Sequence, residues 1–360
     1  MIYHGGNIYA ASRRTGIPPE EIIDFSASIN PLGMPEGALR LIKGDTRRLT
    51  HYPEPYAEGL SARIAARLGV GPESVICGNG STELVYLVPR ALRPSKVLIT
   101  APTFGEYERA CRNAGTADVV SLPLESKQDF DVPPGAFIEA MAGGPARTKA
   151  CNTAFLCNPN NPTGRLVEKA GVLEIAAAAR SMGCYLVVDE AFIDFCPAGS
   201  VAAETAHNPF LVVLRSMTKF YALSGLRIGY GVFHPDTAAR VMAYKEPWTV
   251  NTIAQAAGAA VLEDAAFEKA SLATMAREKA YVEAGLAAIG IPFIPSHANY
   301  YLLKVGRSVE IAAAMEKRGI LVRACSSFAG LDGSHLRVAV RSRQENERLL
   351  REMADVCAHL

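Results

Sequence analysis

The sequence predicts an α/β protein with a mainly parallel sheet, for two reasons. Short apolar runs recur through the first two thirds of the chain, and most of the intervals between them could hold a helix, as residues 172–181 do. Near-continuous apolar strands that alternate with helices are typical of a parallel sheet covered on both faces. Such sheets bind ligands beyond the carboxyl ends of their strands.

The elements follow an irregular N-terminal segment. One short helix is expected at residues 8–15 and a turn at 30–33, where the sequence is Asn-Pro-Leu-Gly. A helix over 59–68 comes next. We then expect seven strands, at residues 75–77, 97–99, 119–122, 154–157, 185–188, 211–214 and 228–233.

The pattern changes past about residue 240. An alanine-rich helical stretch with a break is expected over 253–289, then strands at 299–305, 320–323 and 336–340, and a last helix at 344–358. A chain of 360 residues is long enough for two lobes. We predict a large domain over 46–240 and a smaller α+β domain over 241–360. Residues 1–45 are expected to form an arm and part of the smaller domain.

Overall charge and hydropathy argue against several classes of function. The formal net charge is +1 and the mean hydropathy is +0.11, so nothing attracts the whole chain to nucleic acid or to an anionic membrane. The N-terminus lacks a signal-peptide pattern, and the apolar stretches are too short to cross a membrane. The eight cysteines show no paired CxxC spacing, which predicts reduced thiols in a cytoplasmic protein.

The first strand is followed by a segment that could bind an anion. Residues 78–83 are Gly-Asn-Gly-Ser-Thr-Glu and precede a helix. Glycines that allow close approach, hydroxyl groups and a helix N-terminus together can hold a phosphate, with Gly80, Ser81 and Thr82 as the candidates. A tight turn with a Ser or Thr cap would have the same sequence. No GxGxxG follows the strand, so this is not a dinucleotide fingerprint.

Other strands also end in residues that could serve a site. Phe104 follows the second strand and offers an aromatic face, although it could equally be a core residue. Asn161 lies in the Asn-Pro-Asn-Asn-Pro-Thr-Gly loop after the fourth strand, where two Asn-Pro steps favour an extended backbone. Asp189 directly follows the fifth strand, and its carboxylate is costly to bury without a cationic partner.

Lys219 comes after the apolar run at 211–214. In a dry pocket its amine would lose a proton more easily and could form a Schiff base. Ser216 and Arg227 stand close to it in sequence and could bind a phosphate. Taken alone, Lys219 could also be a solvated surface lysine, because lysines are rarely buried.

Together these elements describe a pocket for pyridoxal phosphate. In chain order they are a phosphate cradle, an aromatic plate, an amide, a buried carboxylate and a lysine, each after a different strand. The carboxylate would keep the pyridine nitrogen protonated, so that the ring withdraws electrons, and the lysine would hold the aldehyde.

The same motifs resemble those of the fold-type I pyridoxal phosphate enzymes of the aspartate aminotransferase superfamily. The residues concerned are Asn-Pro-Asn-Asn-Pro-Thr-Gly, Asp-Glu-Ala-Phe, Ser-Met-Thr-Lys and Gly-Leu-Arg-Ile-Gly-Tyr. Within the superfamily the chain is similar to the histidinol-phosphate aminotransferase branch, and particularly to the threonine-phosphate decarboxylases of cobalamin biosynthesis. That likeness extends over nearly the full length and is carried by residues 4–7, 24–35, 189–195, 214–221, 247–251 and 337–342.

The resemblance implies roles for individual residues. It makes Lys219 the residue that forms the Schiff base and moves protons at the substrate Cα, with Asp189 paired to the pyridinium nitrogen. Asn161 would bind the ring hydroxyl oxygen and Phe104 would stack on the ring. The cofactor phosphate would be held by Gly80, Ser81, Thr82, Ser216 and Arg227. Tyr52 resembles a tyrosine that reaches this phosphate from a partner subunit, which implies a homodimer with shared sites.

Phe192 departs from the aminotransferase pattern. Many aminotransferases have a tyrosine here that donates a hydrogen bond to the ring hydroxyl oxygen. Loss of that donor should raise the pKa of the imine, because a hydrogen bond to the phenolate favours the deprotonated imine. The departure weakens a plain aminotransferase interpretation and is tolerated by the decarboxylase resemblance.

The substrate residues are expected near the two ends of the chain. Arg337 matches an arginine that binds the substrate carboxylate, and Arg323 one that meets a substrate phosphate. The remaining candidates for substrate binding are His4, Asn7, Asn30 and Arg341. Three arginines, Arg323, Arg337 and Arg341, around one site exceed what a monocarboxylate needs, so a phosphorylated amino acid is expected. Arg341 could also be a solvated strand-end residue, and His4 and Asn7 part of a flexible terminus.

The resemblance therefore implies decarboxylation of L-threonine O-3-phosphate to (R)-1-amino-2-propanol O-2-phosphate. Transamination and decarboxylation differ only in which bond at Cα lies perpendicular to the cofactor plane, and positioning groups set that choice. Composition does not show which occurs. A histidinol-phosphate or related aminotransferase is the alternative within the family, and a non-catalytic, ligand-sensing copy of the fold is the alternative outside it. No metal site is expected.

Overall fold

The computed structural model describes residues 5–44, 46–116, 118–144 and 149–359. Its largest sheet has seven strands in the order β2-β8-β7-β6-β5-β3-β4. Every neighbouring pair is parallel except those of β8, which is antiparallel to both β2 and β7. This confirms the predicted fold class. The bounds are β2 Val75–Asn79, β3 Lys96–Ala101, β4 Asp118–Pro123, β5 Thr153–Cys157, β6 Tyr185–Asp189, β7 Leu211–Ser216 and β8 Ile228–Phe233.

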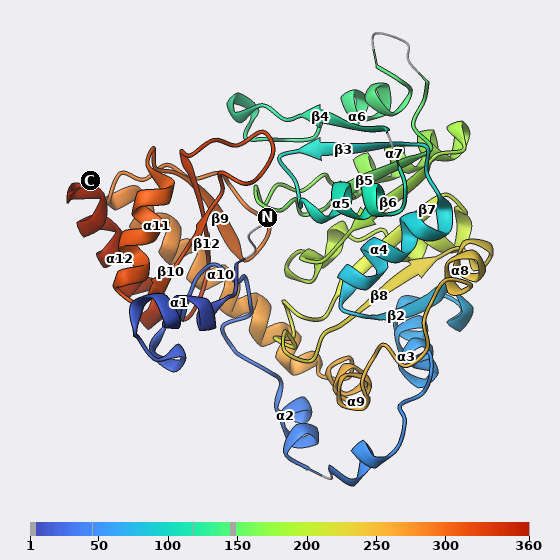
Figure 1. Cartoon of the computed structure of the whole chain (residues 1–360), viewed down its shortest axis with the longest axis horizontal. Helices are drawn as coiled ribbons and strands as arrows, with labels where there is room; N and C mark the ends of the chain where they lie inside the picture. The colour runs from blue at the N-terminus through green and yellow to red at the C-terminus, as the bar shows by residue number, and fades with distance from the viewer. Residues whose placement is uncertain (1–4, 45, 117, 145–148, 360) are drawn as a thin grey trace.

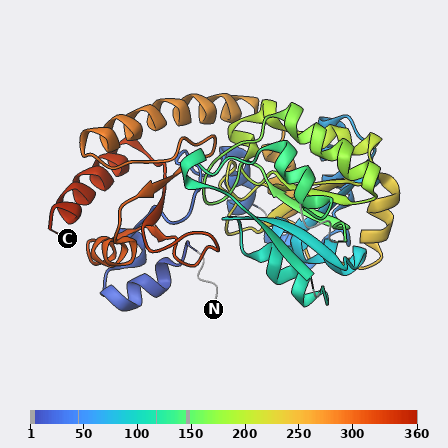
Figure 2. The same ribbon diagram turned by 90° about the horizontal axis from the view of Figure 1, so that it is seen from above.

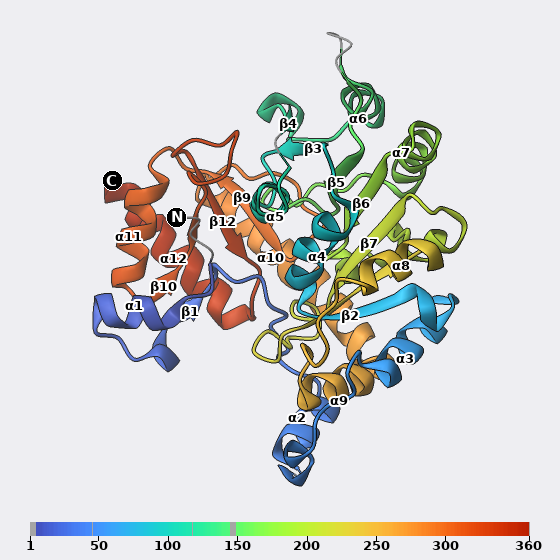
Figure 3. The ribbon, with the colours of Figure 1, turned by 45° about the vertical axis from the view of Figure 1, so that its right-hand side comes forward.

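Helices cover both faces of this sheet (Figures 1 and 3). Successive strand side chains point to opposite faces, so Val187 packs in one hydrophobic cluster and Val188 in another. The first cluster includes residues of α4 Ser81–Leu92, α5 Glu106–Asn113 and α8 Pro235–Met242. The second includes residues of α3 Glu58–Leu68, α6 Pro134–Met141, α7 Lys169–Met182 and α9 Thr252–Val261. Burial on both faces explains why the central strands are continuously apolar.

The C-terminal part of the chain has its own sheet and its own core. β9 Tyr300–Lys304, β12 His335–Ala339 and β11 Arg323–Ala324 form an antiparallel sheet in the order β11-β12-β9. It packs with α10 Ala265–Ala288, α11 Ser308–Lys317 and α12 Arg343–His359 around a third hydrophobic cluster. In Figure 2 the orange helix α10 extends from this part toward the large sheet. The helical stretch is broken between α9 and α10, as expected, and Asp264 caps the second helix.

The expected single strand at 320–323 is wrong. β10 Ile320–Leu321 pairs with β1 Ile23–Asp24 in a parallel two-stranded sheet, whereas β11 pairs with β12. The chain changes partner at Val322, because one backbone edge cannot serve both neighbours. The pairing of β1 with β10 brings the N-terminal segment, including α1 Ile8–Thr15, beside the C-terminal lobe (Figure 1). α2 Glu36–Lys43 instead lies beside α9, and domain limits at 45 and 240 stay a prediction.

Candidate active site

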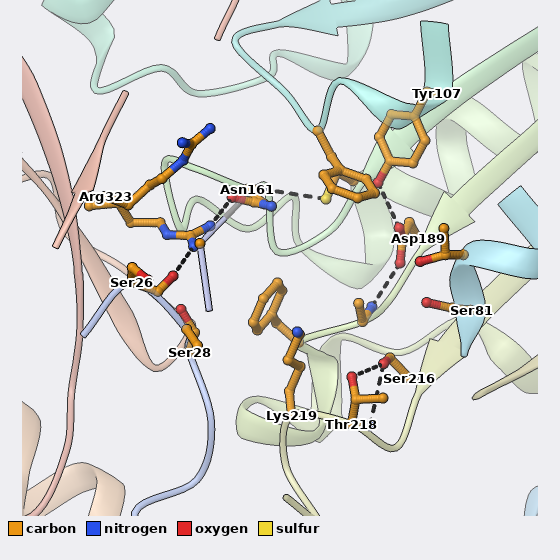
Figure 4. A pocket seen from close by; sticks show the side chains of 18 of the residues that line it. Ser26, Ser28, Ser81, Tyr107, Asn161, Asp189, Ser216, Thr218, Lys219 and Arg323 are labelled. Atoms are coloured by element: carbon orange, nitrogen blue, oxygen red, sulfur yellow. Dashed lines mark hydrogen bonds between the residues drawn. The ribbon is translucent and has the colours of Figure 1, made fainter. Parts of the chain in front are cut away.

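A cavity of about 170 Å³ lies where the carboxyl ends of β5, β6 and β7 face the C-terminal lobe. Both lobes and the N-terminal segment contribute to its wall, and Figure 4 shows their side chains around one space. The lining residues include Ser26, Ser28, Ser81, Thr82, Phe104, Tyr107, Asn161, Asp189, Phe192, Ser216, Thr218, Lys219, Arg227, Arg323 and Arg337. Loops that are far apart in the sequence thus meet at the edge of the sheet, as the topology of parallel strands requires.

Lys219 points into this cavity from the loop after β7. The pKa of its amine is lowered to about 8. Burial is the largest cause, and the positive charges of Arg337 and Arg227 act in the same direction, while Asp189 opposes them. A neutral amine is the form that attacks an aldehyde. The structure therefore makes Lys219 a cavity lysine and not a solvated surface residue.

Asp189 is 4% exposed and stands at the end of β6, on the cavity wall. Its Oδ2 accepts a hydrogen bond of 2.7 Å from the hydroxyl of Tyr107, and its Oδ1 accepts one of 3.0 Å from the backbone N–H of Ala191. Burial raises the pKa of the carboxyl, while these two donors and Lys219 act to lower it. A carboxylate held in this way can bind a protonated ring nitrogen.

The segment before α4 forms an anion cradle with Arg227. Gly80 has φ +71°, and a Cβ at this position would lie 2.6 Å from Nη2 of Arg227. A Cβ on Gly229 would lie 2.4 Å from the backbone nitrogen of Ser81. The two glycines let the guanidinium and strand β8 approach the N-terminus of α4. A helix N-terminus, an arginine and several hydroxyl groups form a binding site for a phosphate dianion.

Hydroxyl groups complete this cradle from the other side. Ser216 Oγ lies 2.7 Å from Thr218 Oγ1, and both side chains line the cavity with Ser81 and Thr82. Ser216 is the last residue of β7 and Thr218 directly precedes Lys219, so one short segment presents both the hydroxyls and the amine.

Arg323 and Arg337 reach the cavity from the C-terminal lobe. Arg337 is 8% exposed; its Nη1 donates to Oδ1 of Asn161 and its Nη2 to the carbonyl of Ser26 at 2.7 Å. Arg323 donates to Ser327 Oγ at 2.8 Å, and its guanidinium lies 5.6 Å from the ring of Phe328. Residues that are paired neighbours on β11 and β12 thus place two guanidinium groups at one site.

Phe104 and Asn161 also line the cavity, as expected. Phe104 meets Tyr107 edge-on, with ring centroids 5.5 Å apart. The amide oxygen of Asn161 faces Arg337, so the hydrogen bonds described for its side chain leave its amide nitrogen to donate to a ligand oxygen. Phe104 also packs against the hydrophobic cluster that contains Val187, and its stacking on a cofactor ring stays a prediction.

Asn30 and Arg341 do not line the cavity, and the structure gives them other contacts. Asn30 Nδ2 donates to the carbonyl of Phe220 at 2.8 Å and to Ser271 Oγ at 2.7 Å. Arg341 binds Glu345 at 2.7 Å within the start of α12. Their roles in substrate binding stay predictions.

The other expected residues lie at the periphery. His4 is outside the described residues. Asn7 caps α1 by accepting a hydrogen bond from the Ala10 N–H, and it is not part of the cavity wall. Tyr52 is 85% exposed and packs on Trp248, with ring centroids 5.4 Å apart. Their roles toward substrate or cofactor stay predictions.

Sequence reasoning missed several residues of the wall, among them Tyr107, Thr218 and Ser28. Tyr107 follows Phe104 by one helical turn, a spacing that could have suggested a shared face. Ser28 lies in the segment quoted for the resemblance, and its buried Oγ has no hydrogen-bond partner among the described residues.

The cavity fits pyridoxal phosphate. It offers a phosphate cradle, an aromatic plate, a buried carboxylate and an amine of lowered pKa around one space. Among the described residues that line it, Asp189 is the one carboxylate, against Lys219 and three arginines. This excess of positive charge favours anionic ligands.

This fold and site are those of a pyridoxal phosphate enzyme, and comparison with known proteins defines the family. The model of the family described as aminotransferase class I and II matches residues 20–353. The chain belongs to this family.

Individual relatives narrow the likeness. The chain is 37% identical over 358 residues to a threonine-phosphate decarboxylase from Salmonella typhimurium. The match covers 98% of this chain and 96% of that protein. The crystal structure of a histidinol-phosphate aminotransferase from Clostridium acetobutylicum is 29% identical with a TM-score of 0.85, over 93% of this chain and 99% of that one. The crystal structure of an L-threonine-O-3-phosphate decarboxylase from Porphyromonas gingivalis is 28% identical with a TM-score of 0.80. This match covers 92% of this chain and 98% of that one.

Proposed function

We propose that this protein uses pyridoxal phosphate to decarboxylate L-threonine O-3-phosphate, giving (R)-1-amino-2-propanol O-2-phosphate and carbon dioxide in cobalamin biosynthesis. The observation that carries the proposal is that Arg323 and Arg337 line the same cavity as Lys219. The substrate has two anionic groups, a carboxylate and a phosphate. The 37% identity to a threonine-phosphate decarboxylase over 98% of the chain supports this choice of substrate.

The chain's own residues would hold the cofactor as follows. Ser81, Thr82, Ser216 and Arg227 bind its phosphate at the N-terminus of α4, with Gly80 giving the necessary close approach. Phe104 would cover the ring, Asp189 would bind the ring nitrogen, and Asn161 would donate to the ring oxygen, since all three line the cavity. When bound, pyridoxal phosphate supplies an aldehyde for amines and a ring that withdraws electrons from the bonds at the substrate Cα.

Arg337 and Arg323 would orient the substrate. We assign the carboxylate to Arg337, which is held rigidly by Asn161 and Ser26, and the phosphate to Arg323. A fixed guanidinium can hold the carboxylate so that the bond from Cα to that carboxylate is the one that breaks. Loss of carbon dioxide leaves an electron pair at Cα, and Lys219 supplies the proton that this carbon takes up. A lysine with a pKa of about 8 can donate and accept a proton near neutral pH.

The direct test is incubation of the purified holoprotein with L-threonine O-3-phosphate. Carbon dioxide and aminopropanol phosphate should form in equal amounts without any 2-oxo acid. Formation of glutamate from 2-oxoglutarate is measured separately in the presence of amine donor. Glutamate formation without carbon dioxide would contradict the proposal.

An aminotransferase acting on histidinol phosphate is the second candidate. The similarity to histidinol-phosphate aminotransferases favours it, since the same arginines would accept a phosphorylated amine. Phe192 argues against it, because this side chain packs edge-on against Tyr300 with ring centroids 4.9 Å apart and has no hydroxyl for the ring oxygen. Histidinol phosphate with 2-oxoglutarate as acceptor tests this candidate, and rapid glutamate formation would favour it over the decarboxylase.

We also propose that the protein is a cytoplasmic homodimer with shared active sites. The exposed pair of Tyr52 and Trp248 supports this, because rings of this size on a surface are typical of contacts between proteins. Tyr52 of each subunit would reach the phosphate cradle of the other. Free thiols at all eight cysteines are in keeping with a cytoplasmic location, and none of the described helices is long and apolar enough to cross a membrane.

A further inference from the structure

Tyr107 has a position that the cofactor and substrate assignments leave unexplained. It is completely buried in the first turn of α5, yet its hydroxyl reaches the cavity wall. That hydroxyl donates to Oδ2 of Asp189 at 2.7 Å, across 82 positions of sequence. In Figure 4 the side chain points from its own helix toward the carboxylate.

Two aromatic contacts fix the orientation of the Tyr107 ring. It stacks on Phe155 with ring centroids 5.1 Å apart and an interplanar angle of 17°. It meets Phe104 edge-on at 5.5 Å and 80°. The ring therefore has little freedom to follow the carboxylate if Asp189 moves.

We propose that Tyr107 is a positioning residue, which holds the carboxylate of Asp189 ionised and aimed at the ring nitrogen of the cofactor. The inference rests on the proposed role of Asp189. Tyr107 itself need touch neither the cofactor nor the substrate.

The chemistry of the phenol suits this role. Burial and the neighbouring Asp189 charge raise the pKa of Tyr107 well above its usual value, so it stays a neutral donor at every working pH. A neutral donor stabilises the carboxylate without taking the place of the cationic ring nitrogen as its charge partner. With Ala191 N–H on Oδ1, each carboxylate oxygen has one protein donor and retains capacity for a ligand.

Other titratable groups also face this position. They are Cys157 beside the phenol and the carboxylate, Lys219 across the cavity and the buried Tyr300. Burial raises the pKa of Cys157 to about 12 and the pKa of Tyr300 well above its usual value. Neither changes charge near neutral pH, so a pH effect of removing the Tyr107 hydroxyl passes through Asp189 and Lys219.

The test is the pH titration of the visible absorbance of the holoprotein for Tyr107→Phe. The band fades as the bond between Lys219 and the cofactor loses its proton. An ionised Asp189 keeps the ring nitrogen protonated. The positive charge on that nitrogen makes the bond between Lys219 and the cofactor lose its proton at a lower pH. Loss of the hydroxyl should therefore move the midpoint upward by about one unit, the size of one hydrogen bond to a charged group. The ring is kept, so no core cavity is made.

Tyr301→Phe is the matched control. Tyr301 is also a completely buried phenol that donates to a carboxylate, Glu283, but it lies in the C-terminal core away from the cavity. Its midpoint should equal that of the unaltered protein. An unchanged midpoint in Tyr107→Phe, or an equal shift in Tyr301→Phe, would overturn the inference.

Asp189→Asn separates this inference from the role of Asp189. If Tyr107 acts through the carboxylate, Tyr107→Phe adds no further shift in an Asp189→Asn background. Additive shifts would show that the phenol acts by another route and would also overturn the inference. An Asp189→Asn protein with an unshifted midpoint would instead refute the proposed role of Asp189 itself.

Discussion

The amine of Lys219 is made reactive by its surroundings. Removal from water disfavours its charged form, and the guanidinium groups of Arg337 and Arg227 do the same by repulsion. Asp189 opposes both effects. The outcome is a pKa of about 8, compared with about 10.4 for a lysine in water. A larger fraction of the amine is therefore neutral near pH 7.

We expect the rate at which the apoprotein binds pyridoxal phosphate covalently to depend on this pKa. Below pH 8 the amine is mostly protonated, so the rate should rise about tenfold per pH unit and then level off above pH 8. Stopped-flow absorbance measures this directly. A rate that still rises at pH 10 would mean that the lysine is not perturbed.

Arg337→Gln should move the midpoint of this pH–rate profile to a higher pH. The substitution removes a positive charge that lowers the pKa of Lys219. Arg341→Gln is the control, since Arg341 is an arginine of the same lobe that binds Glu345 and lies outside the cavity. It should leave the midpoint unchanged. Equal shifts in the two variants would point to a general charge effect.

At the scale of elements, an ion pair between buried side chains links the ends of β6 and β7. Asp189 and Ser216 face the ligand side, whereas the residues next to them, Glu190 and Arg215, are buried on the other side. Arg215 Nη1 donates to Glu190 Oε2 at 3.1 Å, and Nη2 donates to Asp194. The backbone N–H of Val201 donates to Glu190 Oε1 at 2.7 Å. This ion pair joins the two strand ends that carry the candidate catalytic residues.

Breaking the pair from one side should be costly. Arg215→Met leaves a buried carboxylate without its cation, and we expect it to lower the free energy of unfolding by about 3 kcal/mol or more. Urea denaturation measures the loss. The double variant Arg215→Met with Glu190→Gln should be destabilised less than the sum of the two single changes. Additive losses would indicate that the two side chains do not interact.

The turn before α4 is the second element that shapes the site. Gly80→Ala would combine a strained φ with a Cβ 2.6 Å from the Arg227 guanidinium, so Arg227 must move away from the cradle. We expect the dissociation constant for pyridoxal phosphate to rise at least about tenfold, the equivalent of about 1.4 kcal/mol. Equilibrium titration of the apoprotein gives this value.

Gly183→Ala is the control for the turn. Gly183 has φ +63°, but a Cβ at this position would have no neighbouring atom within 4 Å, so the variant carries the strain without the clash. It should lose about 1 kcal/mol of stability and keep its affinity for the cofactor. Loss of affinity in both variants would assign the effect to strain alone.

For the whole molecule, the proposed shared site predicts complementation between inactive chains. Lys219→Ala lacks the amine and Tyr52→Ala lacks the ring that would reach the partner. After the two are mixed and allowed to exchange subunits, half of the dimers are hybrids, and each hybrid has one intact site. Activity should recover to about a quarter of that of the unaltered protein. No recovery in a mixture with proven exchange would place Tyr52 in its own subunit's site or outside any site.

The large sheet was accessible from the sequence because its signal is local. The central strands β5, β6 and β7 are short apolar runs, and burial on both faces dictates that pattern. The residues just beyond the strand ends, such as Asp189 and Lys219, then fall at one edge of the sheet by topology. The strand at 320–323 was mistaken for one element because a change of pairing partner leaves no mark in hydropathy.

The arrangement of the site residues was accessible only in part. Nothing in the sequence shows that Tyr107 reaches Asp189 or that Arg337 binds Asn161, since these contacts join segments 82 and 176 residues apart. The contacts of Asn30 and Arg341 are likewise visible only in the tertiary structure. Both lie in motif-rich segments, but their hydrogen bonds are used by Phe220, Ser271 and Glu345.

The sequence by itself determined the fold class and the set of groups that a pyridoxal phosphate site needs, because residue type and strand-end position are local properties. The tertiary structure alone decided which arginines enter the cavity, how strongly the pKa of Lys219 is lowered, and which donors hold Asp189. Burial and charge proximity are sums over residues that are distant along the chain, and only folding brings those residues together.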